Sequence, residues 1–104
     1  LVNHSNPKNF KKRKKISLSC KTNSNKYLLG YLHYREVNQT KKWIKRKLVK
    51  IKNVYNVTIP ANFTDTDYPI QYYFEFENKQ FSSFAPGFNK FLSNQPYYLL
   101  RQKN

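Results

Sequence analysis

The sequence predicts an all-β protein, an antiparallel β-sandwich of about seven strands with an immunoglobulin-like arrangement. Short segments alternate apolar and polar residues with period two, which is the pattern of half-buried strands. Turn residues interrupt these segments about every eight to twelve residues, a spacing typical of sandwiches. No segment has the apolar periodicity of a helix longer than one turn, and a five-stranded oligonucleotide-binding barrel would need longer strands.

The segment 70–77 carries the clearest alternation. One face holds large apolar residues, namely Ile70, Tyr72, Phe74 and Phe76. The other face holds Gln71, Tyr73, Glu75 and Glu77. We therefore expect a central strand with one face in the core, packed against a second layer of strands.

The N-terminal residues 1–15 are predicted to form a basic arm or linker, and residues 16–104 a single sandwich domain. The arm contains the run Lys11-Lys12-Arg13-Lys14-Lys15 and, in Phe10, one large aromatic residue. A charged, solvated chain end is the simplest interpretation of such a run.

Three strands are expected in the first half of the domain, at 16–21, 28–36 and 41–49. Cys20 points inward in the first strand, which predicts a buried structural thiol. Gly30 lies in the second strand and should make room for a neighbouring bulky ring. The third could also be a helix, because Lys, Arg and Leu favour one, but the β-branched residues just beyond it favour a strand.

The second half adds strands at 54–59, 81–85 and 96–101 around the segment 70–77. The first of these points Tyr55, Val57 and Ile59 inward and ends at Pro60. Residues 61–67 should form a loop, and Pro86-Gly87 a turn.

The positive charge is concentrated in the first half of the chain. The formal net charge is +15, and residues 1–53 contain sixteen Lys or Arg against one acid, Glu36. This asymmetry favours a polyanionic partner, either nucleic acid, a sulfated or uronic polysaccharide, or an acidic membrane surface. A compositional bias toward Lys and Asn is the alternative. No apolar run is long enough to span a membrane.

The best candidate for a binding site lies in 41–47. On an exposed strand, Trp43, Lys45 and Lys47 would form one row, in which the ring stacks on a sugar or base and the cations pair with sulfate, carboxylate or phosphate. The remaining candidates are the neighbouring cations Lys42 and Arg46 and, if the preceding strand pairs with this one, Tyr31, His33 and Arg35. The alternative places Trp43 in the core, with the lysines only solubilising an edge strand.

Patterns typical of catalysis or metal binding are weak. Glu75 and Glu77 have a spacing that overlaps that of inverting glycosidases, but any exposed strand can give it. Asp65 and Asp67 could offer oxygens to calcium, although Asx turns are commoner in such loops. The chain has only two histidines and two glycines. We therefore predict no enzymatic activity, no metal and no cofactor.

Several phrases of the sequence resemble those of a known family. These are His33-Tyr34-Arg35 followed by Trp43, then Val54-Tyr55-Asn56-Val57-Thr58-Ile59-Pro60-Ala61, then Pro69-Ile70-Gln71-Tyr72-Tyr73-Phe74-Glu75-Phe76. They resemble strands of the immunoglobulin-like or fibronectin type III-like accessory modules of secreted bacterial polysaccharide-degrading enzymes. The resemblance implies a non-catalytic domain attached to the catalytic domain of a lyase, hydrolase or sulfatase, secreted or at the cell surface.

These observations favour a carbohydrate-binding accessory module that grips an anionic polysaccharide. A purely structural spacer in a multidomain enzyme is the alternative. Nucleic-acid binding is a further possibility that the charge favours, but the chain has no recognised nucleic-acid motif.

Overall fold

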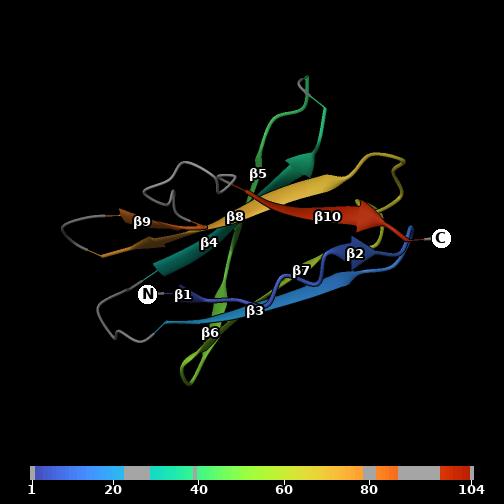
Figure 1. Cartoon of the computed structure of the whole chain (residues 1–104). Helices are drawn as coiled ribbons and strands as arrows, with labels where there is room; N and C mark the ends of the chain where they lie inside the picture. Colours follow the sequence, from blue (N-terminus) through green and yellow to red (C-terminus); the bar gives the residue numbers. More distant parts are fainter. Residues whose placement is uncertain (1, 23–28, 39, 79–81, 87–96, 104) are drawn as a thin grey trace, which may run out of the picture.

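The computed structural model describes residues 2–22, 29–38, 40–78, 82–86 and 97–103, which form two β-sheets packed face to face (Figure 1). These residues contain no helix, and so none that could cross a membrane. The strands are β1 (Val2–Asn3), β2 (Asn9–Phe10), β3 (Ile16–Thr22), β4 (Leu29–Glu36), β5 (Ile44–Lys47), β6 (Val49–Ile51), β7 (Val54–Ile59), β8 (Ile70–Glu77), β9 (Ser82–Ala85) and β10 (Tyr98–Gln102).

The strand order confirms the predicted sandwich. One sheet has the order β1-β3-β7-β6, and the other has the order β2-β10-β8-β4-β5, with β9 paired to β8. The first sheet matches the ABED order of immunoglobulin domains, and β4, β8 and β10 occupy the places of strands C, F and G. All described pairs are antiparallel except β2 with β10.

The pair formed by β4 and β8 is the centre of the larger sheet. Their register runs from Leu29 opposite Glu77 to Glu36 opposite Ile70. Strand β8 alternates buried and partly exposed residues along its whole length, as predicted. A Cβ atom on Gly30 would lie 2.9 Å from Leu48 Cδ1 and 3.0 Å from the Phe76 ring. The expectation that Gly30 makes room for a bulky ring is therefore confirmed.

The prediction of a single strand over residues 41–49 is wrong. Strand β5 ends at Lys47, Leu48 is buried, and β6 belongs to the opposite sheet. In Figure 1 the chain runs from one sheet to the other between β5 and β6. The Leu48 N–H donates to the Gly30 carbonyl at 2.8 Å, and the Leu48 side chain is buried at the point where the chain crosses.

The N-terminal segment, predicted as a basic arm or linker, is instead part of the sandwich. Strand β1 pairs with β3 and β2 pairs with β10, so the N-terminal segment contributes a strand to each sheet. Phe10 is only 4% exposed and belongs to the core. The gain from burying this ring, about 2 kcal/mol, helps to offset the entropy lost in ordering the segment.

The remaining strands lie close to their predicted positions. The residues predicted to point inward in β3 and β7 are buried, Cys20 among them. Strand β9 begins at Ser82 and β10 runs from Tyr98 to Gln102. Gly87 of the predicted turn and Pro96 at the start of the predicted closing strand lie outside the described residues.

Candidate functional site

The candidate residues of β4 and β5 share the solvent-facing side of the larger sheet. Lys47 lies opposite Tyr31 and Lys45 opposite His33 in the antiparallel pair, and the same register continued by one step brings Trp43 opposite Arg35. Side chains that are opposite in a pair point to the same face. We call this face the outer surface, made of Tyr31, His33, Arg35, Trp43, Lys45, Lys47, Tyr73 and Tyr97.

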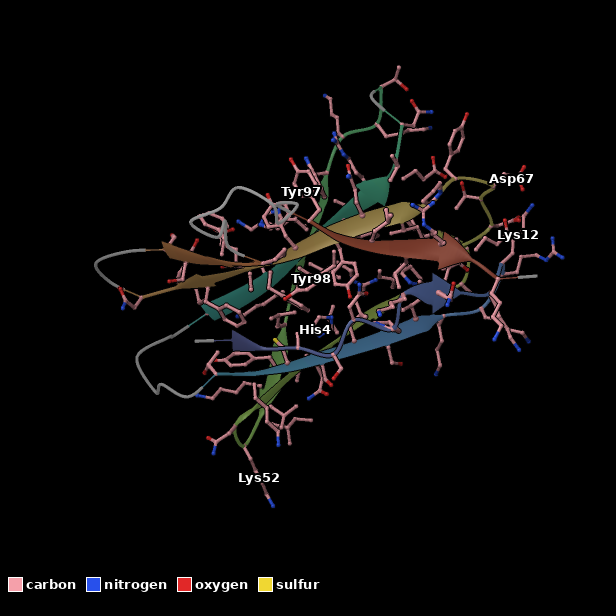
Figure 2. All side chains as sticks on the ribbon, viewed as in Figure 1. His4, Lys12, Lys52, Asp67, Tyr97 and Tyr98 are labelled. Atoms are coloured by element: carbon pink, nitrogen blue, oxygen red, sulfur yellow. The ribbon has the colours of Figure 1, made fainter. Side chains whose placement is uncertain are left out.

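Trp43 lies on the outer surface and not in the core. The indole is partly exposed and packs against two tyrosines, with ring centroids 5.0 Å from Tyr73 and 5.1 Å from Tyr97. Figure 2 places Tyr97 on the side of the larger sheet away from the core, and Tyr98 toward His4 between the sheets. The alternative that Trp43 is a core residue is therefore excluded.

Arg35 holds a fixed position over Trp43. Its guanidinium carbon is 4.4 Å from the centroid of the indole ring. The Nε–H donates to Gln71 Oε1 at 2.6 Å, and Nη1 donates to the Lys41 carbonyl at 3.4 Å. The indole is thus not the open platform expected from the sequence, because a cation already covers part of it.

The middle of the outer surface holds a histidine that is engaged with a carboxylate. The His33 ring stacks on Tyr73 with centroids 4.5 Å apart and an interplanar angle of 11°. His33 Nε2 is 2.7 Å from Glu75 Oε1, and both side chains are largely buried. Burial, with a smaller contribution from the charge of Glu75, raises the pKa of Tyr73, so this ring keeps its hydroxyl proton at neutral pH. Glu75 is engaged by His33, which weakens the idea that Glu75 and Glu77 act as an acid pair.

The lysines of β5 flank the rings on the edge of the sheet. Lys45 Nζ is 4.1 Å from the centroid of the Tyr31 ring, and Lys47 is exposed beside it. One predicted residue does not share this face. Arg46 lies opposite Leu32, whose side chain is in the core, so it points to the reverse side of β5. Lys42 lines a hollow of about 300 Å³.

Comparison of the chain with protein-family models, curated proteins and solved structures finds no match. The outer surface must therefore be interpreted from its own residues. The resemblance to accessory modules of polysaccharide-degrading enzymes stays a prediction.

Two aromatic residues of the outer surface were missed by sequence reasoning. Tyr73 was correctly placed on the wet face of its strand, but its contact with Trp43 depends on how β4, β5 and β8 pair. Tyr97 comes from the end of the chain and lies against both rings. Local alternation gives the face of a residue and not its neighbours, so no signal in the sequence joins these three rings.

The other chemical candidates are engaged in structural contacts. Asp67 Oδ1 accepts from Lys12 Nζ at 2.7 Å. Asp65 Oδ1 lies 3.7 Å from Arg13 Nη1. Within the described residues no group of three or more His, Cys, Asp or Glu could hold a metal. Burial raises the pKa of the Cys20 thiol to about 12, so it stays protonated and is a poor nucleophile at neutral pH.

Proposed function

We propose that this protein is a non-catalytic binding module that holds an anionic polysaccharide, sulfated or uronic, on its outer surface. The observation that carries the proposal is the cluster of Trp43, Tyr73 and Tyr97 on the exposed face of a sheet, with cations along its edge. Aromatic rings on a flat, rigid sheet suit the apolar face of a sugar ring, and they lose little conformational entropy on binding.

The charges beside the rings support an anionic ligand. Arg35 is held by Gln71 and the Lys41 carbonyl, which leaves guanidinium N–H groups for a sulfate or carboxylate. Lys45 and Lys47 stand two residues apart on β5, about 6 to 7 Å along the strand. Successive anionic groups of an extended chain could pair with this row, while sugar rings contact the aromatic cluster.

The test is a titration of the full chain against sulfated, uronic and neutral glycans and single-stranded DNA, at about 50 and about 300 mM salt. Trp43→Ala is compared with Tyr68→Ala, which removes an exposed aromatic residue elsewhere on the molecule. We expect one class of anionic glycan to keep measurable affinity at the higher salt, and Trp43→Ala to lower that affinity about tenfold or more. Tyr68→Ala should leave it unchanged.

Two results would contradict the proposal. Binding of every polyanion, lost in the higher salt and equal in both variants, would mean that only the net charge acts. Measurable affinity at the higher salt for single-stranded DNA alone would favour the nucleic-acid alternative.

A structural spacer is the second candidate, and Phe84 favours it. This ring is 53% exposed on β9 and lies 6.0 Å from Tyr73 between centroids, so it extends the aromatic cluster with an apolar group. Apolar groups exposed together often mark a protein interface. If the outer surface packs on the catalytic domain of a parent enzyme, Phe84→Ser should weaken that association, and the chain should bind no glycan through this surface.

A further inference from the structure

A second basic feature lies at the edge of the sandwich where the N-terminal segment meets the end of the chain. Four lysines line a hollow of about 340 Å³ whose floor includes the buried residues Phe10 and Ile16. The lysines are Lys11, Lys14, Lys15 and Lys103. We call it the basic hollow. It shares no residue with the outer surface.

Hydrogen bonds fix the backbone that carries these lysines. The Lys14 N–H donates to the Lys11 carbonyl at 3.2 Å and closes a turn. The hydroxyl of the fully buried Thr64 donates to the Lys14 carbonyl at 2.8 Å, which ties this turn to the loop before β8. The Lys103 N–H donates to the Phe10 carbonyl at 2.8 Å. The backbone at Lys11, Lys14 and Lys103 is therefore fixed by the fold, which keeps these three lysines at the hollow.

The acids near the basic hollow serve other partners. Lys12 and Arg13, in the middle of the same run, reach Asp67 and Asp65, and Figure 2 shows Lys12 beside Asp67 at this end of the molecule. Among the described residues, no carboxylate forms an ion pair with the four lysines of the hollow. Like charges gathered around one apolar floor repel each other, and a bound anion would relieve that repulsion.

We propose that the basic hollow binds a tetrahedral oxyanion, a sulfate or phosphate group. Four lysines around one hollow suit a compact dianion, because an ammonium group is a point charge that needs no planar partner. The apolar floor lowers the local dielectric and strengthens the attraction. The volume exceeds that of a bare ion, which leaves room for the sugar that would carry a sulfate or phosphate ester. This inference does not depend on the function proposed for the outer surface.

The test is a nuclear magnetic resonance titration of the full chain with sodium sulfate and with sodium phosphate, with sodium chloride added to hold ionic strength constant. Lys14→Gln combined with Lys103→Gln is compared with Lys50→Gln combined with Lys52→Gln. The control pair removes the same charge from exposed positions at and after β6. We expect saturable shifts of the amides around Lys11, Lys14 and Ser17, with affinity about tenfold weaker in the first double variant and unchanged in the control.

Two further titrations identify the source of the anion. Tighter binding of a hexose sulfate than of inorganic sulfate assigns a sulfated sugar, and tighter binding of a hexose phosphate than of inorganic phosphate assigns a phosphorylated ligand. Equal losses in both double variants, or shifts that never saturate, would overturn the proposal, because diffuse charge would then explain the binding. Trp43→Ala should leave sulfate binding intact, so this test stands apart from that of the outer surface.

Discussion

The outer surface and the basic hollow place positive charge in two different settings. On the outer surface, Arg35 and Lys45 lie against aromatic rings, and the carboxylate of Glu75 is engaged by His33. In the basic hollow, four exposed lysines line one depression of the surface. Contacts that combine rings with cations depend on ligand shape and resist salt, whereas exposed lysines respond mainly to charge. The two regions should therefore differ in salt dependence and in selectivity.

The largest effect on stability is expected at Gly30, which lies on the core side of β4, behind the outer surface. Gly30→Ala should lower the free energy of unfolding by about 2 to 3 kcal/mol, because the new Cβ would collide with Leu48 and the Phe76 ring. Leu48 is the point where the chain leaves β5, so the same change should weaken glycan binding on the outer surface. Urea denaturation, with Thr58→Ala as an exposed strand control, measures the first effect. Equal stability of the two variants would show that the site can relax.

A smaller loss is expected when the N-terminal segment is loosened. Tyr72 Oη lies 2.6 Å from His4 Nε2 and 3.0 Å from Asn6 Oδ1. Tyr72→Phe would leave these groups without that partner, at a cost of about 1 to 2 kcal/mol. Tyr68→Phe removes an exposed hydroxyl and is the matched control. If amide exchange in β1 and β2 is no faster in Tyr72→Phe, the hydroxyl is not what holds the segment.

The pH dependence of stability measures the contribution of His4. Burial is the main reason that its pKa lies below the ordinary value of 6.5, partly offset by the bond from Nδ1–H to the Ser19 carbonyl. Its contribution is therefore complete above pH 6.5 and is lost as the pH falls below it, because the unfolded chain takes up the proton first. Thermal melts between about pH 7.5 and about pH 5 should show this decline. The decline should be smaller in His4→Gln, and identical profiles would exclude His4 as its source.

The smallest expected effect is the difference between Lys12 and Lys14, which belong to the same basic run. Lys12→Gln should change the affinity of the basic hollow for sulfate much less than Lys14→Gln, because Lys12 Nζ is 2.7 Å from Asp67 and does not line the hollow. Melting temperature should hardly change either, since the Asp67 side chain is 85% exposed and such ion pairs contribute little. Calorimetric titration of both variants with sulfate measures the difference. Equal losses of sulfate affinity in the two variants would mean that the whole run acts only through its net charge.

Sequence reasoning predicted features that depend on local alternation. The burial of β8, the space at Gly30 and the row formed by Trp43, Lys45 and Lys47 follow from period two and from residue size. Features that depend on distant partners could not be predicted in this way. His4 contacts Tyr72, 68 residues further along the chain, and this contact joins the pairing of β1 and β2 in making the predicted arm or linker part of the sandwich.

The crossing at Leu48 shows the same limit within a short segment. Alternation continues from Ile44 through Arg46 to Leu48, so the sequence reads as one strand. Burial of Leu48 against Gly30 sends the chain to the opposite sheet instead. Arg46 lies on the opposite face from Lys45 and Lys47, as the alternation itself predicts.

The central claim is that the outer surface recognises an anionic glycan by shape as well as charge. The most direct measurement follows the Trp43 indole N–H and the backbone amides by nuclear magnetic resonance while a sulfated or uronic oligosaccharide is added at about 300 mM salt. We predict saturable shifts at Trp43, Tyr73 and the amides of β4 and β5, absent in Trp43→Ala. Shifts confined to the basic hollow, or no shifts at this salt concentration, would contradict the account.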